Sequence, residues 1–175
     1  MDQKKLEQAA RLIIEAVGED PKREGLLETP RRFAEMVAEQ LAYAAVPNEE
    51  IARAFDKTFS SPESDMVVVK DISLFSHCEH HIALMYNMKA AVGYIPRGRV
   101  IGLSKIARIA DAVSKRLQIQ ERIGADIRDI MERITGAGDV IVLLEGEHSC
   151  MTARGIRKPG TLTRTISASG RFRTD

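Results

Sequence analysis

The stretch IALMYNMKAAVGY, residues 82–94, decides the fold class of this chain. Every second residue in it is apolar: Ile82, Leu84, Tyr86, Met88, Ala90, Val92 and Tyr94. A side-chain period of two sustained over 13 residues predicts a long, half-buried β-strand, because successive side chains of a strand point to opposite faces. Pro96 and Gly98 end the pattern, and we expect the strand to be one half of an antiparallel pair.

The segments around this strand complete an α+β pattern. Met66–Val69 is a β-branched run that predicts a preceding strand, and residues 140–146 and 161–170 predict two later strands. Two apolar stripes at helical spacing lie between them: Ile106, Ile109, Ala110, Val113 and Leu117, then Ile123, Ile127, Ile130 and Ile134. Strand pairs separated by a helix pair predict a four-stranded antiparallel sheet with two helices on one face.

The N-terminal part of the chain is predicted to be helical. We expect residues 1–60 to form a helical segment packed on the core, and residues 61–175 to form the core, within a single domain overall. A second helix begins at Thr29-Pro30, because Thr is a good N-cap and Pro suits the first helical position. Residues 48–55 predict a short third helix. The stripe of the first helix is Leu6, Ala9, Ala10, Ile13, Ala16 and Val17.

Composition excludes several classes of protein. The 175 residues include 26 basic and 25 acidic side chains, a balance that argues against general nucleic-acid binding and against a polybasic membrane anchor. No stretch approaches the roughly 20 apolar residues that span a bilayer, and charges interrupt every apolar run at the N-terminus, unlike in a signal peptide. We therefore expect a cytoplasmic protein that binds neither nucleic acid nor membrane.

The two cysteines of the chain each lie close to a histidine. Cys78 and His81 stand at C-x2-H spacing within SHCEHH, and His148 and Cys150 stand at H-x-C spacing. In a cytosolic chain such a pair of cysteines indicates a metal site or a catalytic thiol more than a disulfide. Zinc takes thiolate and imidazole ligands, and Cys78, His81 and Cys150 would leave a fourth position open for water.

An open position favours hydrolysis, because a metal lowers the pKa of bound water from about 15.7 towards ~7. His80 and His148 would then be free to move protons beside the metal. Two alternatives stay open. Each residue taken singly could be a packed or surface side chain, and a closed structural zinc site could use His80 or His148 as its fourth ligand.

The segment GLSKIAR predicts a helix start that binds an anion. Ser104 would cap this helix, and Lys105 and Arg108 lie on one face of its first turn. Cations at this position oppose the helix dipole, and a bound phosphate would reverse that cost. The alternative is a solvated helix start.

Two further clusters carry chemistry. The basic run ARGIRK follows Cys150 and contains Arg154, so a polyphosphate would explain both basic clusters, whereas a surface charge run is the alternative. Gln120 and Glu121 begin the second core helix, where a carboxylate gains from the helix dipole. The same carboxylate could accept two N–H bonds from a guanine edge, and sites built on such bonds discriminate strongly.

Four motifs in this order, SHCEHH, GYIPRGRVIGLSKIARI, QIQERI and HSCMTARGIRKPG, resemble GTP cyclohydrolase I. The N-terminal GEDPKREGLLETPRRFAEM is similar to the lead-in of that family, and the resemblance covers roughly residues 5–170. It implies hydrolysis of GTP to formate and 7,8-dihydroneopterin triphosphate, the first step towards tetrahydrofolate and tetrahydrobiopterin. It also implies the tunnelling fold (T-fold) and a ring-shaped homodecamer of two stacked pentamers with sites between subunits.

The resemblance implies a role for each candidate residue. The metal and catalytic set is Cys78, His81 and Cys150 for zinc, His80 and His148 for proton transfer, and Ser104 for the later sugar rearrangement. The substrate set is Glu121 with Gln120 on the guanine N1 and 2-amino edge, and Lys105, Arg108, Arg154 and Arg32 on the triphosphate. Water activated by the zinc would attack C8 of the guanine. Some members carry a lysine at the position of Glu35, and His77 occupies a variable position, so neither receives a role.

Two other functions compete with this interpretation. A different enzyme on the same fold, such as a nitrile reductase of deazaguanine metabolism, uses a cysteine nucleophile, and here both cysteines fall in the zinc pattern. A non-catalytic, zinc-stabilised nucleotide-binding assembly would hold zinc with four protein ligands.

Overall fold

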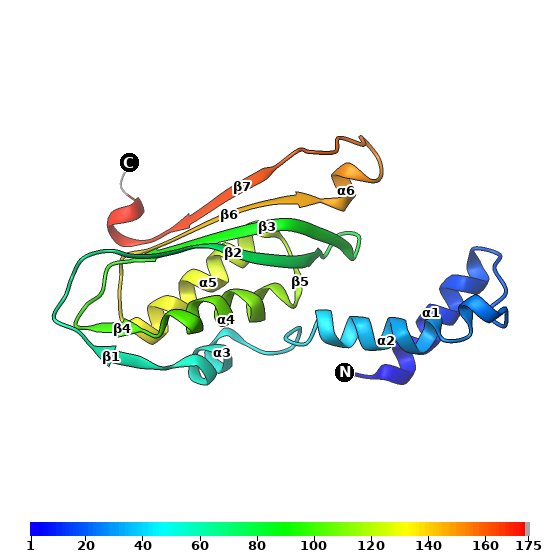
Figure 1. Cartoon of the computed structure of the whole chain (residues 1–175), viewed down its shortest axis with the longest axis horizontal. Coiled ribbons are helices and arrows are strands. Elements are labelled where there is room, and N and C mark those ends of the chain that lie inside the picture. Colours follow the sequence, from blue (N-terminus) through cyan, green and yellow to red (C-terminus); the bar gives the residue numbers. More distant parts are fainter. Residues whose placement is uncertain (174–175) are drawn as a thin grey trace. The chain divides into compact units, whose positions relative to one another are not determined.

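The computed structural model describes residues 1–173. The chain forms two compact units, Met1–Ala42 and a core that begins at Tyr43 (Figure 1). Helix α3 (Asn48–Phe55), which the sequence predicted with these bounds, packs on α5 (Gln120–Thr135) and so belongs to the core. Among the described helices, none combines the length and the apolar character that crossing a membrane requires.

The N-terminal unit is a helical hairpin. Helix α1 (Gln3–Ala16) packs on α2 (Thr29–Gln40), and the short 3-10 helix η1 (Glu24–Leu26) precedes α2. Asp2 caps α1, because its carboxylate accepts a hydrogen bond from the Lys5 backbone N–H at 3.1 Å.

Two sequence-based details of this hairpin are wrong. The predicted stripe of α1 is right at Ala10, which is buried, and wrong at Ile13 and Val17, which are exposed. Ile14, which the prediction left out, is buried, because it lies four residues after Ala10 on the same helix face. Thr29 is already inside α2 and does not cap it, and among the described residues no side chain makes a capping hydrogen bond to the first turn of this helix.

The core contains a sheet with strand order β5-β2-β3-β6-β7. Its four long strands are antiparallel, as predicted, and a two-residue strand β5 adds to β2 in parallel. Strands β1 and β4 form a separate antiparallel ribbon. The bounds are β1 Thr58–Ser60, β2 Val67–Cys78, β3 Ala83–Tyr94, β4 Arg99–Ile101, α4 Leu103–Ser114, β5 Leu117–Gln118, β6 Val140–His148, α6 Ser149–Thr152, β7 Thr163–Ala168 and η2 Gly170–Arg173.

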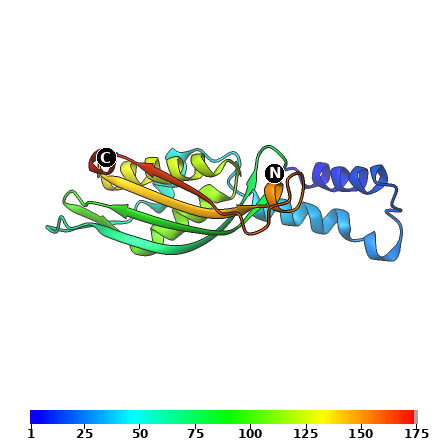
Figure 2. The ribbon, with the colours of Figure 1, turned by 90° about the horizontal axis from the view of Figure 1, so that it is seen from above.

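Helices α4 and α5 cover one face of this sheet (Figures 1 and 2). The predicted stripes of both helices are buried, apart from Leu117, which lies in β5 and is partly exposed. They pack with Met88, Val92 and Leu144 of the central strands in one hydrophobic core. Gly136 ends α5 in the left-handed conformation that a helix C-terminus favours, at φ 67°.

A bulge at Asn87 changes the side-chain alternation of β3. Met88, Ala90 and the following alternate residues face the core as predicted. In the residues of β3 before the bulge, the alternation of buried and exposed side chains is reversed: Met85 is buried and Leu84 is exposed. The predicted core face is therefore wrong in this part of the strand. The physical reason is one extra residue, Asn87 at φ 50°, which β3 carries relative to both β2 and β6.

Ile130→Ala tests the predicted helix–sheet core. Ile130 of α5 is 0% exposed, so truncation should lower the free energy of unfolding by about 3 kcal/mol through lost burial and a cavity. Urea unfolding at fixed protein concentration measures this change. The matched control is Ile156→Ala at an exposed loop residue, which should change the free energy by less than about 0.5 kcal/mol. Equal effects of the two substitutions would contradict the assignment of this core.

Candidate metal centre and active site

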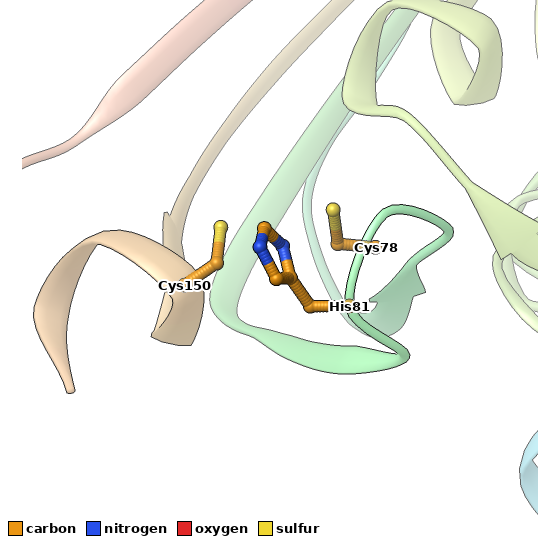
Figure 3. Close-up of side chains that lie close together, drawn as sticks. All are labelled: Cys78, His81 and Cys150. Atoms are coloured by element: carbon orange, nitrogen blue, oxygen red, sulfur yellow. The ribbon is translucent and has the colours of Figure 1, made fainter. Parts of the chain in front are cut away.

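Cys78, His81 and Cys150 converge at one end of the sheet (Figure 3). Cys78 is the last residue of β2, His81 lies in the turn to β3, and Cys150 lies in α6 directly after β6. One ligand atom from each residue can be chosen so that all lie within 4.8 Å of one another. The sequence-predicted ligand set is therefore brought together by strands that both pair with β3.

The chemistry of these donors fits zinc. Two thiols and one imidazole are ligands that Zn²⁺ prefers, and three protein ligands leave one tetrahedral position for water or substrate. Burial, followed by the neighbouring Cys78 thiol, raises the pKa of the Cys150 thiol. A cation placed between the two sulfurs reverses this effect, because it stabilises both thiolates.

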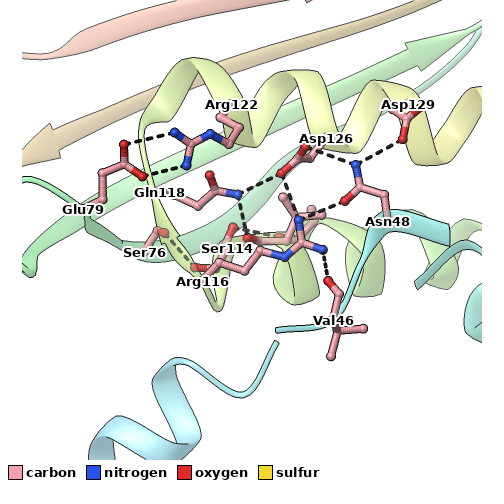
Figure 4. A network of polar contacts seen from close by, with 12 residues as sticks. Val46, Asn48, Ser76, Glu79, Ser114, Arg116, Gln118, Arg122, Asp126 and Asp129 are labelled. Atoms are coloured by element: carbon pink, nitrogen blue, oxygen red, sulfur yellow. Dashed lines mark hydrogen bonds and ion pairs between the residues drawn. The ribbon is translucent and has the colours of Figure 1, made fainter. Parts of the chain in front are cut away.

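The turn that carries His81 is tied down by backbone and ionic contacts. The Glu79 backbone N–H donates to the Gln118 carbonyl at 2.9 Å, and the Arg122 guanidinium donates to both Glu79 carboxylate oxygens at 2.7 and 3.0 Å (Figure 4). The hydrogen bond from Arg122 holds the pKa of Glu79 below its usual value. Ile82 closes the turn at φ 49°, a conformation that is strained for a β-branched residue and that clusters at functional sites.

A polar network behind Cys78 fixes the strand and helices that support it. Arg116 donates to Asp126 Oδ2 at 3.0 Å and to Asn48 Oδ1 at 2.9 Å, and Gln118 Nε2 donates to the same Asp126 oxygen at 3.0 Å (Figure 4). Nearby, the buried Ser76 hydroxyl donates to the Ser114 carbonyl at 2.7 Å. These bonds connect β2, β5, α3, α4 and α5 at the end of the sheet where the ligands lie.

The two histidines predicted to move protons flank the ligand group. His80 Nδ1 lies 3.5 Å from the Cys78 sulfur, and its ring is exposed. His148 is half-buried at the end of β6, and its Nε2 lies 2.8 Å from Gln120 Oε1. Burial lowers the pKa of His148, and the nearby Glu121 carboxylate partly offsets this effect.

Glu121 and Arg154 complete this end of the core. Glu121 lies in the first turn of α5 with an exposed side chain, close enough to His148 for its charge to act on that ring. Arg154 follows α6, and its Nη1 lies 3.1 Å from His81 Nε2. A guanidinium thus lies beside one candidate ligand, and a carboxylate lies near His148.

Ser104, Lys105 and Arg108 are not brought to this group within one chain. They lie in the first two turns of α4, whereas the other end of α4, at Ser114, is bonded to Ser76 near the ligands. Twelve helical residues span about 18 Å, so the two groups lie a helix length apart (Figure 1). The predicted capping role of Ser104 is wrong, because α4 begins at Leu103 with Gly102 at the cap and no side-chain cap bond.

Arg32 belongs to the N-terminal unit. It is exposed on α2, where its charge helps to lower the pKa of Glu28 after the larger effect of Arg31. Glu35, for which no role was predicted, accepts a hydrogen bond from Arg31 at 2.6 Å. His77, also without a predicted role, is half-buried next to Cys78, and burial lowers its pKa.

Sequence reasoning missed the residues that hold the Cys150 segment in place. Tyr86 Oη lies 2.9 Å from Thr152 Oγ1, and Asn87 Nδ2 donates to Glu147 Oε1 at 2.9 Å. The other Glu147 oxygen accepts from the Gly160 backbone N–H at 3.2 Å. Tyr86 and Asn87 lie at the bulge of β3, and because both fit the alternation of residues 82–94, the sequence pattern carries no signal for their roles.

Comparison with known proteins gives one consistent family. The model of the family described as GTP cyclohydrolase I matches residues 6–175. Proteins named GTP cyclohydrolase 1 from Clostridium acetobutylicum and Clostridium beijerinckii are 56% and 55% identical to this chain, and each match covers 100% of this chain and 92% of the relative. Among solved structures, the archaeosine synthase QueF-Like in the apo form is similar with a TM-score of 0.48 and 18% identity, over 63% of this chain and 96% of that chain.

Cys150→Ser should abolish stoichiometric zinc binding. Loss of one of three protein ligands should weaken zinc affinity at least about 100-fold, because the remaining thiol and imidazole form an incomplete site. Elemental analysis after dialysis against a weak chelator measures the zinc retained. Ser149→Ala, which removes a neighbouring hydroxyl outside the ligand set, should retain zinc. Full zinc content in Cys150→Ser would remove Cys150 from the ligands.

Proposed function

The chain belongs to the GTP cyclohydrolase I family, and from this premise we propose how its residues carry out the hydrolysis of GTP. The reaction converts GTP and water to formate and 7,8-dihydroneopterin triphosphate, the first step towards folates and other pterins. The observation that carries the assignment of the site is the convergence of Cys78, His81 and Cys150, with proton-transfer groups and a carboxylate around them.

Cys78, His81 and Cys150 hold the metal in this proposal. Zinc bound by two thiolates and an imidazole supplies Lewis acidity and makes water nucleophilic near neutral pH. The protein contributes the fixed geometry: β2 and β6 set the two sulfurs, and the Glu79–Arg122 ion pair holds the turn that carries His81.

Glu121 recognises the base. Its exposed carboxylate has two acceptor oxygens, which match the N1–H and 2-amino donors on one edge of guanine. Adenine presents no such pair of donors at this edge, so binding it would leave the carboxylate unpaired.

His148 and His80 transfer protons while the imidazole ring of guanine opens. Burial lowers the pKa of His148, which favours the neutral ring that accepts a proton. His80 lies against the Cys78 sulfur and is exposed, so it is able to exchange protons with solvent beside the metal.

The triphosphate contacts require more than one subunit. Arg154 lies beside His81, but Lys105, Arg108 and Ser104 lie at the far end of α4. We place them on the same GTP through a neighbouring copy of the chain, in a homodecamer of two stacked pentamers with sites between subunits. The open edge of the sheet at β7 supports a ring, because unpaired strand edges favour closure with a neighbour. Arg32 of the N-terminal unit is the remaining proposed phosphate contact.

A cytoplasmic location is part of the same proposal. Both cysteines are free thiols, and a reducing compartment keeps them available as ligands.

A GTP assay tests the function. Zinc-loaded protein incubated with GTP should release formate and a pterin triphosphate, which oxidation and dephosphorylation convert to fluorescent neopterin. Prior removal of zinc by a strong chelator should abolish the product, and zinc addition should restore it. ATP in place of GTP should give no product, because its base lacks the donors that Glu121 accepts. Zinc-loaded protein that leaves GTP unchanged would reject the proposal.

Mixed assemblies test the shared site. Lys105→Ala and Cys150→Ser should each inactivate the enzyme. The first damages the phosphate-binding half of the site, and the second damages the metal-binding half that the neighbouring subunit supplies. Mixed assemblies made by co-expression should recover about a quarter of the wild-type activity, since one site in four receives both intact halves when equal numbers of subunits mix at random. The control pairs Lys105→Ala with Arg108→Ala, which damage the same half and should not complement. Native mass spectrometry verifies the mixing and counts the subunits. No recovery in verified mixed assemblies would rule out sites shared between subunits.

A further inference from the structure

Gln120 makes its side-chain contacts inside the protein. It is the first residue of α5 and is 1% exposed. Its Nε2 donates to the Thr163 carbonyl at 2.9 Å and to the Leu144 carbonyl at 3.2 Å, and it lies 3.4 Å from Thr165 Oγ1. Both protons of the amide are therefore engaged by the strands β6 and β7.

These contacts determine which way the amide points. A backbone carbonyl oxygen only accepts hydrogen bonds, so the NH₂ group of Gln120 must face Leu144 and Thr163. The amide oxygen Oε1 must then face His148, whose Nε2 lies 2.8 Å away. Because Oε1 is only an acceptor, the Nε2 atom of His148 must carry the proton in this bond.

The protonated Nε2 fixes the rest of the ring. A neutral imidazole carries one ring proton, so the proton on Nε2 leaves Nδ1 with a free lone pair. Within residues 1–173 no protein group is bonded to Nδ1 of His148. Oε1 of Gln120 accepts from Nε2 whether His148 is neutral or protonated, so the same contact holds the ring in both states.

We propose that Gln120 is a positioning residue that holds His148 in the Nε2–H tautomer, so that His148 accepts and donates protons through Nδ1 alone. The proposal rests on the proposed function, because it deepens the role of His148 as a proton-transfer group. The gain is geometric: the atom that exchanges the proton stays in one place throughout the reaction.

The same hydrogen bonds indicate that Gln120 and its neighbour Glu121 have different roles. To bind the guanine edge, the Gln120 amide would have to give up its hydrogen bonds to the Leu144 carbonyl, which is buried, and to the Thr163 carbonyl, which is partly buried. Glu121 is exposed and is free to face the base. At the start of α5, Gln120 thus positions His148, and Glu121 recognises guanine.

Gln120→Met tests the assignment, because Met is of similar length and has no oxygen that accepts from His148. We expect kcat to fall by about 100-fold, the scale of one proton-transfer group, with KM within about twofold of wild type. Glu121→Ala should instead raise KM by roughly 10- to 100-fold, because it removes charged hydrogen bonds to the base. Thr165→Val, which removes only the longest contact of Gln120, should match wild type in both constants.

Two results in folded, zinc-replete Gln120→Met would overturn the proposal. A rise in KM with unchanged kcat would make Gln120 a base-recognition residue, and unchanged values of both constants would deny it any role. Thermal unfolding and zinc content establish that the variant is folded.

Neutron diffraction of the wild-type enzyme at neutral pH or above gives a second test that needs no variant. We expect nuclear density for a deuteron on His148 Nε2, directed at Gln120 Oε1, and none on Nδ1. A deuteron on Nδ1 with a bare Nε2 would overturn the proposal. This measurement does not depend on activity, so wild-type protein inactive on GTP would reject the proposed function while the tautomer could still be determined.

Discussion

The pairing of β3 with β2 on one side and β6 on the other is the constraint on which the rest of the structure depends. The extra residue at Asn87 shifts the register against both neighbours by the same step. Met85 therefore lies opposite Ser76 in β2 and opposite His148 in β6 at the same time. Since Cys78 and Cys150 each follow two residues later, both sulfurs arrive at one end of the sheet.

The bulge has a second consequence for the site. By reversing the alternation it buries Met85 and turns Tyr86 towards Glu147 and Thr152. A bulge re-aims side chains where a regular strand would continue its pattern. Here the re-aimed residues hold the segment that carries Cys150, so the irregular part of the strand supports the candidate metal centre.

Polar contacts behind the ligands give this end of the core its rigidity. The Arg116 and Asp126 side chains are 13% and 17% exposed, and with Asn48 they form a hydrogen-bonded network in which Nη1 and Nη2 of Arg116 have acceptors, while its buried Nε has none. Networks of this kind specify one arrangement of the elements they join, because a partly bonded alternative would leave buried polar groups unpaired. Helix α4 separates two groups of residues: its C-terminal end lies near the candidate metal ligands, and its cationic first turns lie a helix length away.

The sequence by itself determined the helix pair, the antiparallel strands, the candidate ligand triad and the family resemblance, because periodicity and motif spacing are local properties of the chain. The stripes of α4 and α5 and the bounds of α3 followed directly from the order of residues. Only the tertiary structure decided which side chains of β3 face the core before Asn87. This depends on how β3 pairs with β2 and with β6 at the same time. The tertiary structure also decided the contacts of Gln120 and the separation of Lys105 from the metal ligands, because hydrogen bonds and distances between segments far apart in the chain have no signature in either segment alone.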